Sequence, residues 1–152
     1  MNRILFICHG NICRSPMAEA VMRHLVKEAG AARSYFIDSA ATSREELGNP
    51  IYPPAKRALA AHGIPSGDHT ARQMTRADYD GFDLLIGMDH RSLANMRRIA
   101  GSDPESKICL LLAYAGRPED EVADPWYTGD FEATFRDVRA GCLGLLAALG
   151  TD

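Results

Sequence analysis

The sequence predicts a doubly wound α/β domain, in which helices cover both faces of a parallel sheet, and three observations support this. The 152 residues, of which 46% are hydrophobic and 24% charged, match the length and composition of one ordinary globular domain. Short apolar runs, typical of strands buried on both faces, recur along the chain. Helical patterns lie between these runs, and such alternation favours a parallel sheet. We therefore expect a single domain over residues 1–152.

Four apolar runs are the expected strands, at residues 4–7, 35–37, 84–86 and 108–112. The first helix is expected to have Ser15 as its N-cap and Pro16 at its first position, and to stop at Gly30. Further helices are expected over residues 53–62, after the N-cap Asp89, and over residues 131–149. Two irregular segments, residues 39–52 and 112–129, follow strands, and loops at the carboxyl ends of parallel strands usually carry the functional site.

Composition and charge argue against several functions. With 17 basic and 20 acidic residues the net charge is −3, which is unfavourable for a protein that neutralises many phosphates of a nucleic acid. No apolar stretch reaches the roughly 18 residues of a membrane span, and the first apolar run is too short for a secretory signal. We therefore expect a cytoplasmic protein with reduced cysteines and without nucleic-acid or membrane partners.

The segment from Cys8 to Ser15 joins a buried strand to a helix and is the strongest functional signal. Gly10 and Asn11 tolerate left-handed backbone geometry, so that successive amides can turn inward and form an anion-binding nest. The start of the helix adds unpaired N–H groups and the positive end of its dipole. We expect these groups and Arg14 to favour the thiolate of Cys8 and to bind the oxygens of a transferring phosphoryl group. Ser15 could donate its hydroxyl to this thiolate, cap the helix, or do both.

This loop resembles the signature of the low-molecular-weight protein tyrosine phosphatases, through Cys8, Gly10, Asn11, Cys13, Arg14, Ser15, Pro16 and the following Met17, Ala18 and Glu19. Three later patches, residues 38–40, 69–73 and 124–127, match the same family in order and spacing. The resemblance implies a flavodoxin-like fold with a four-stranded parallel sheet. It also implies a phosphomonoesterase without metal or cofactor, which forms a cysteinyl-phosphate intermediate. The implied substrate is a tyrosine-phosphorylated protein, the product is inorganic phosphate, and the implied state is a monomer.

The resemblance also implies roles for particular residues. Cys8 corresponds to the nucleophile, Arg14 to the phosphate clamp, and Asp124 to the general acid that protonates the leaving phenolate and then activates water. The other phosphate- and substrate-binding residues are implied to be His9, Gly10, Asn11, Ile12, Cys13, Ser15, Trp126 and Tyr127, with Ser39 and His69 as support. Without the family pattern, Cys8 could be a small buried residue, Asp124 a turn former, and Asp89 a helix cap rather than a second acid.

Two further features of the loop and its surroundings bear on function. Members of the family use a neighbour at the position of Cys13 to trap the oxidised nucleophile as a reversible disulfide, although Cys13 could equally fill loop volume. Residues 41–46 depart from the family's common pattern of a glycine and an aromatic residue. This departure predicts a more open and more polar wall opposite Trp126 and Tyr127.

Three alternative functions are less consistent with the sequence. The first is an arginine phosphatase of the same family, although Ile12 occupies the position where that branch tends to have threonine. The second is a thiol-dependent arsenate reductase, which is disfavoured because residues 87–106 contain no cysteine for a relay. The third is a metal or redox-sensing module with Cys8, His9 and Cys13 as ligands, which lacks a second ligand pair at short spacing.

Overall fold

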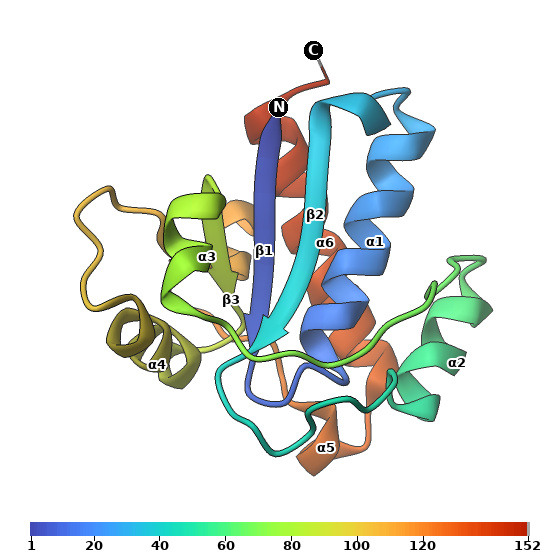
Figure 1. Cartoon of the computed structure of the whole chain (residues 1–152). Helices are drawn as coiled ribbons and strands as arrows, with labels where there is room; N and C mark the ends of the chain where they lie inside the picture. Colours follow the sequence, from blue (N-terminus) through green and yellow to red (C-terminus); the bar gives the residue numbers. More distant parts are fainter. Residues whose placement is uncertain (152) are drawn as a thin grey trace.

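Four parallel strands form one sheet in a computed structural model that describes residues 1–151 (Figure 1). The strands are β1 (Asn2–Cys8), β2 (Tyr35–Ala41), β3 (Leu84–Gly87) and β4 (Ile108–Leu110), and their order across the sheet is β2-β1-β3-β4. Each neighbouring pair runs parallel, for example β1 and β2 from the pair Asn2 and Tyr35 to the pair Cys8 and Ala41. The predicted four-stranded parallel sheet is therefore confirmed.

Helices connect the strands and cover both faces of the sheet. They are α1 (Arg14–Glu28), α2 (Pro53–Ala61), α3 (Arg76–Gly81), α4 (His90–Ala100), α5 (Pro125–Thr128) and α6 (Phe131–Leu149). Two short 3₁₀ turns, η1 (Ala32–Ser34) and η2 (Leu111–Ala115), complete the regular structure of residues 1–151. Among residues 1–151, none of the helices has both the length and the apolar character that a membrane crossing would require.

The alternation of side chains along β1 divides the core into two layers. Ile4 and Phe6 belong to one apolar cluster with residues of α1, α2 and α6. Leu5 and Ile7 belong to a second cluster with residues of α3 and α4. All four side chains are completely buried. A continuous apolar run is therefore required here, because successive residues of a strand point to opposite faces and both faces are covered.

Several expected element ends were wrong, and β1, for example, spans Asn2–Cys8 rather than residues 4–7. α1 begins two residues earlier than expected, at Arg14, so that Cys13 is its N-cap and Ser15 lies inside the helix, where its hydroxyl makes other contacts. β2 continues to Ala41 because its backbone pairs with Cys8 of β1. β4 ends at Leu110, where the chain turns into η2 and packs against α6.

The short helix α3 was missed because six residues are too few for a helical period to be recognised. Its start does carry a local signal, a capping box between Thr75 and Asp78. The backbone N–H of Thr75 donates to Asp78 Oδ2 over 2.7 Å.

The strand order places two loops side by side at the carboxyl edge of the sheet. The chain leaves β1 toward β2 on one side, whereas β3 lies on the other side, so that the order of connection reverses at β1. Ligands of open parallel sheets bind at such a reversal, outside the carboxyl ends of the strands. The loop after β1 and the start of α4 after β3 therefore face a common space.

Candidate active site

Cys8, the last residue of β1, lies at the floor of the loop that leads into α1. Cys8 is 3% exposed. Its Sγ accepts a hydrogen bond from the backbone N–H of Asn11 over 3.3 Å and lies 3.0 Å from Ser15 Oγ. Asn11 has a φ of 60°, one of two positive values among the non-glycine residues of the described chain. This left-handed residue turns the loop so that an amide points at the sulfur.

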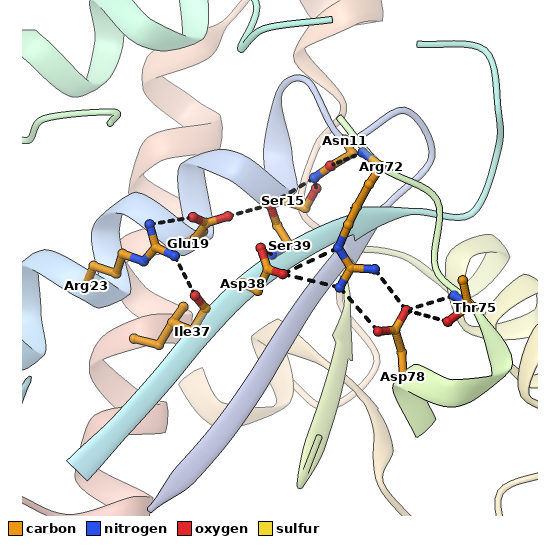
Figure 2. Close-up of polar contacts among 10 residues, drawn as sticks. All are labelled: Asn11, Ser15, Glu19, Arg23, Ile37, Asp38, Ser39, Arg72, Thr75 and Asp78. Atoms are coloured by element: carbon orange, nitrogen blue, oxygen red, sulfur yellow. Dashed lines mark hydrogen bonds and ion pairs between the residues drawn. The ribbon is translucent and has the colours of Figure 1, made fainter. Parts of the chain in front are cut away.

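The strained conformation of Asn11 is stabilised by four hydrogen bonds, of which Figure 2 shows those with Ser15, Ser39 and Arg72. Its Nδ2 donates to Ser15 Oγ over 2.8 Å and to Ser39 Oγ over 2.9 Å, while its Oδ1 accepts from the backbone N of Arg72 over 3.1 Å. Its carbonyl oxygen accepts from His69 Nε2 over 2.6 Å. Ser39 and His69, which the family resemblance implied as supporting residues, are thus both in contact with Asn11, and such contacts are what hold a strained residue in place.

Two supporting residues were missed by sequence reasoning. Glu19 is a nearly buried carboxylate on α1, and its Oε1 accepts from Ser39 Oγ over 2.6 Å. The signal that could have found it is a charged residue within a run that is otherwise apolar, Met17 to Met22, all of which is buried. The second is Arg72, whose backbone holds Asn11 and whose side chain pairs with Asp38 and Asp78.

The guanidinium of Arg14 reaches over the loop and is 3% exposed. Its Nη1 donates to Asp89 Oδ2 over 2.8 Å and to the carbonyl of Val122 over 3.2 Å, and its Nη2 lies 3.4 Å from Asp124 Oδ2. Asp89 caps α4 as expected, because its Oδ1 accepts from the backbone N of Ser92 over 2.7 Å. Its second contact, with Arg14, was not foreseen.

Burial and opposite charges compete in setting the proton affinities of this pair. Burial by itself would lower the pKa of Arg14, but the charge of Cys8 and the hydrogen bond to Asp89 raise this pKa above its ordinary value. Burial by itself would raise the pKa of Asp89, but Arg14 and the Ser92 N–H outweigh it and lower this pKa. Both groups therefore remain charged at neutral pH.

Cys13 lies in the same loop but in a different electrostatic environment. Burial, followed by the neighbouring charge of Cys8, raises the pKa of Cys13 to about 12. This thiol is consequently protonated at neutral pH. The four cysteines of the described chain are free thiols in the structure.

A pocket of about 450 Å³ opens above the loop. Trp126 and Tyr127, at the start of α5, form part of its wall and are 56% and 84% exposed. The ring of Trp126 packs against that of Tyr52, with centroids 5.1 Å apart. Thr42, Glu45 and Glu46 also line the pocket and make this part of its wall polar, and Glu45 Oε2 is 2.9 Å from His9 Nε2.

The structure brings the predicted site residues together in two groups. Those that line the pocket are Cys8, His9, Gly10, Ile12, Cys13, Arg14, Asp124, Trp126 and Tyr127. Those that lie behind the loop are Asn11, Ser15, Ser39 and His69. Pocket-lining residues that the sequence did not indicate are Arg91, Ser92 and Asn95, and Asp89, which was expected only as a helix cap, also lines the pocket. Within residues 1–151, the His, Cys, Asp and Glu side chains form no group of three or more that could hold a metal ion.

The arrangement suits an anion that is attacked by sulfur. Backbone amides, a helix N-terminus and a guanidinium surround the space next to a buried thiol, and these are the groups that bind the oxygens of a phosphoryl group. A carboxylate, that of Asp124, lies at the edge of the same pocket, where it can exchange protons with a bound molecule. Fold and site together define a class, the cysteine-dependent phosphatases built on a parallel α/β sheet.

Comparisons with known proteins identify the family. A family model described as "Low molecular weight phosphotyrosine protein phosphatase" matches residues 3–152. The chain is 39% identical over 150 residues to the low molecular weight protein-tyrosine-phosphatase YfkJ of Bacillus subtilis, covering 98% of this chain and 96% of that protein. It is 38% identical over 147 residues to the human low molecular weight phosphotyrosine protein phosphatase, covering 94% and 92%. The chain belongs to the low molecular weight phosphotyrosine protein phosphatase family.

Solved structures agree with this assignment. The crystal structure of YfkJ superposes with a TM-score of 0.94, covering 98% of this chain and 94% of that chain at 39% identity. A structure described as a drosophila arginine phosphatase superposes with a TM-score of 0.89, at 32% identity, covering 100% and 99%. The flavodoxin-like fold that the resemblance implied is therefore confirmed.

Proposed function

We propose that this chain hydrolyses phosphotyrosine in proteins, with Cys8 as nucleophile, Arg14 as phosphate clamp and Asp124 as general acid and base. The observation that carries the proposal is the environment of the buried Cys8. Its Sγ accepts a hydrogen bond from the Asn11 N–H over 3.3 Å, and the guanidinium of Arg14 in the same loop is held by Asp89 and Asp124. The hydrogen bonds that hold Asn11 are all made with other residues of the chain. The loop is therefore organised before a phosphoryl group binds.

In the first half-reaction, the sulfur of Cys8 attacks phosphorus and the bond from phosphorus to the phenolic oxygen breaks. Tyrosine has an ordinary pKa of about 10, so the phenolate leaves poorly unless it receives a proton. Asp124 delivers this proton, and the product is tyrosine together with phosphorylated Cys8. Loop amides and Arg14 bind the three equatorial oxygens, on which charge is concentrated in the transition state.

In the second half-reaction, water attacks phosphorus and the sulfur–phosphorus bond breaks. Asp124, now ionised, accepts the proton from water, and inorganic phosphate leaves. Ser15 Oγ lies 3.0 Å from Cys8 Sγ, where a donated hydrogen bond stabilises the departing thiolate. Residues of this chain and one water account for every bond and proton in this cycle, so the proposed mechanism requires no metal or cofactor.

The depth of the pocket supports phosphotyrosine as the substrate. Cys8 is buried at the floor, and Trp126 and Tyr127 stand at the rim, so that a long flat ester reaches the sulfur whereas phosphoserine stops short. Phosphoarginine is the competing substrate, since one similar structure is described as an arginine phosphatase. Ile12 lines the pocket with an apolar side chain, which favours an aryl ring over a charged guanidino group.

We further propose that the enzyme acts as a cytoplasmic monomer on phosphorylated proteins, without nucleic-acid partners. A reducing compartment would keep the neighbouring thiols of Cys8 and Cys13 free, and the proposed nucleophile, clamp and acid line one pocket without a residue from a second copy. Size-exclusion chromatography of active enzyme tests this, because activity confined to a dimer fraction would contradict it.

One experiment tests the mechanism directly. Hydrolysis of phenyl phosphate and nitrophenyl phosphate is measured in EDTA for the wild type, Cys8→Ser and Asp124→Ala. We expect a metal-independent wild type and an inactive Cys8→Ser. Asp124→Ala should lower kcat for phenyl phosphate by about 10²–10⁴-fold, and much less for the better nitrophenolate leaving group. Activity of Cys8→Ser, or equal losses for both esters in Asp124→Ala, would overturn the assigned roles.

A further inference from the structure

The carboxylate of Glu19 is an unusual feature of α1, because it lies behind the phosphate loop and does not line the pocket. It is 8% exposed, and it links the exposed side chain of Arg23 to Ser39 and through it to Asn11 (Figure 2). We propose that Glu19 is a positioning residue, whose carboxylate fixes the direction of the hydrogen bonds behind the loop so that Ser15 donates to Cys8. This inference rests on the proposed function, in which Cys8 reacts as a thiolate.

The direction of the hydrogen bonds begins at Arg72. A backbone N–H can only donate, so the atom of the Asn11 amide that faces the Arg72 N–H at 3.1 Å must be the oxygen, Oδ1. The other amide atom, Nδ2, then has two hydrogens and no acceptor capacity. These hydrogens point to Ser15 Oγ at 2.8 Å and to Ser39 Oγ at 2.9 Å.

Both serine hydroxyls therefore accept from Asn11 and keep their own hydrogen for another acceptor. Ser39 donates to Glu19 Oε1 over 2.6 Å. Ser15 lies 3.0 Å from Cys8 Sγ and is the donor when Cys8 is a thiolate, because a thiolate has no hydrogen. An ionised carboxylate and a thiolate are both acceptors without hydrogens, so each terminates one branch of the network. The two branches share the Nδ2 group of Asn11.

A rotated Asn11 amide is the competing arrangement. Its oxygen would then accept from both serines, and the hydroxyl of Ser15 would be withdrawn from Cys8. In that arrangement the carboxylate of Glu19 loses the hydrogen of Ser39, and a buried charged acceptor without a donor is costly. Glu19 therefore disfavours the rotated amide, together with the backbone N–H of Arg72.

Arg23 completes the arrangement from the surface. Its Nη1 lies 2.8 Å from Glu19 Oε2, one turn along α1, and its Nη2 donates to the carbonyl of Ile37 over 2.6 Å. One carboxylate oxygen of Glu19 is thus occupied by the guanidinium, and the other remains for Ser39. The positive charge of Arg23 also offsets a negative charge that would otherwise oppose a thiolate at Cys8.

The test compares Glu19→Met with Glu19→Gln. Both variants remove the charge, but glutamine keeps an oxygen that accepts from Ser39, whereas methionine has a similar length and no comparable acceptor. We expect Glu19→Met to lower kcat for an aryl phosphate about tenfold with KM within twofold, which is the effect of one lost hydrogen bond to the thiolate. Glu19→Gln should stay within about threefold of the wild type. Glu28→Gln, an exposed substitution on the same helix, is the control and should leave kcat unchanged.

A second measurement reports on Cys8 without turnover. The rate of inactivation by iodoacetate is followed against pH, and its midpoint should lie about 1 pH unit higher in Glu19→Met than in Glu19→Gln. If Glu19 acted only through its negative charge, the midpoint would move to lower pH and by the same amount in both variants. Because this readout needs no substrate, it separates a failure of the inference from a failure of the proposed phosphatase function, which the Cys8→Ser assay reports.

A double-mutant cycle with Ser15→Ala decides whether Glu19 acts through Ser15. In the Ser15→Ala background, Glu19→Met should have little further effect on kcat or on the inactivation midpoint. Independent, multiplicative effects, or equal behaviour of Glu19→Met and Glu19→Gln, would overturn the proposal. If Glu19→Met does not fold because Arg23 is left unpaired, the same comparison is made in the Arg23→Met background, where equal kcat values and midpoints would again overturn it.

Discussion

Arg14 and Asp89 lie 75 positions apart in the sequence, yet Arg14 Nη1 donates to Asp89 Oδ2 over 2.8 Å. The other oxygen of this carboxylate accepts from the backbone N of Ser92 and so caps α4. One side chain therefore orients the phosphate clamp and begins a helix. The contact joins the loop after β1 to the loop after β3, which the strand order places next to one another.

These two tasks of Asp89 can be separated by substitution. Asp89→Ser keeps a side chain that caps helices well, whereas Asp89→Ala does not, and neither can pair with Arg14. We expect both variants to lower kcat/KM for an aryl phosphate by about tenfold, because Arg14 loses its orientation. Asp89→Ala should be less stable than Asp89→Ser by about 1 kcal/mol in urea unfolding. Wild-type kinetics of Asp89→Ser would show that the ion pair does not orient Arg14.

The lowered pKa of Asp89 predicts how the stability of the folded chain depends on pH. Since this pKa is lower in the folded chain than the ordinary value of about 4, its contribution to stability is fully present above that value and is lost as pH falls through the folded-state pKa. The difference in unfolding free energy between wild type and Asp89→Asn should therefore be constant from pH 7 to about 5 and shrink below about 4. Urea titrations at several pH values measure it, and a difference that persists unchanged to pH 3 would contradict this origin.

The raised pKa of Cys13 predicts selective alkylation. With a pKa of about 12, Cys13 is a thiol at pH 7, and thiols react slowly with iodoacetamide. Cys8 should therefore be labelled first, as detected by peptide mass spectrometry, and phosphate should protect it. In Cys8→Ser, the peptide that contains Cys13 should remain mostly unlabelled, because burial, the larger cause of its raised pKa, persists. Labelling of Cys13 as fast as that of Cys8 would be evidence against this environment.

Oxidation tests the disulfide that the family resemblance implies. Cys8 and Cys13 line the same pocket as free thiols. Peroxide should convert the Cys8 thiolate to a sulfenic acid, which the Cys13 thiol then attacks with loss of water. We expect a mass loss of about two hydrogens in the peptide that spans both residues. Cys13→Ser is the control and should instead accumulate sulfinic acid at Cys8; the same sulfinic product in the wild type, with Cys13 free, would exclude the protective disulfide.

The close contact between α6 and η2 predicts that one added methyl group at Gly144 strongly lowers the stability of the fold. A Cβ at Gly144 would overlap the backbone carbonyl of Tyr114, and backbone cannot move aside as a side chain can. Gly144→Ala should therefore destabilise the chain by about 1–3 kcal/mol or more, although alanine favours a helix. Gly81→Ala, at the end of α3 with no atom within 4 Å of the added Cβ, is the matched control and should be neutral or slightly stabilising. Equal melting temperatures would show that α6 shifts away.

Local sequence was sufficient for features that depend on neighbours in the chain. The apolar run at residues 4–7 predicted a strand covered on both faces, and Asp89 was identified as a cap from its place before a helical pattern. Ser15 shows where such reasoning fails. A serine before proline has the composition of an N-cap, but its hydroxyl is used by Asn11 and Cys8, so the helix begins earlier at Arg14.

Residues whose partners are remote in sequence were harder to predict. Nothing near Glu19 in sequence indicates that Ser39 will donate to it, and nothing near Arg72 indicates that its backbone will fix the amide of Asn11. Ser39 reaches this place because β1 and β2 run in register, and Arg72 reaches it because its segment pairs with the end of β2 through the bridge between Ala41 and Gln73. Pattern and propensity describe neighbours along the chain, whereas this register is a property of the sheet.

The sequence by itself determined the parallel sheet, the chemistry of the loop from Cys8 to Ser15 and the family, since these follow from apolar patterning and from residue types at short spacing. The tertiary structure decided how that chemistry is oriented: which carboxylates hold Arg14, and in which direction the hydrogen bonds behind Cys8 run. The physical reason is that hydrogen bonds and ion pairs act over about 3 Å and with a fixed donor and acceptor. Packing of the two apolar layers on the sheet brings those partners within that distance.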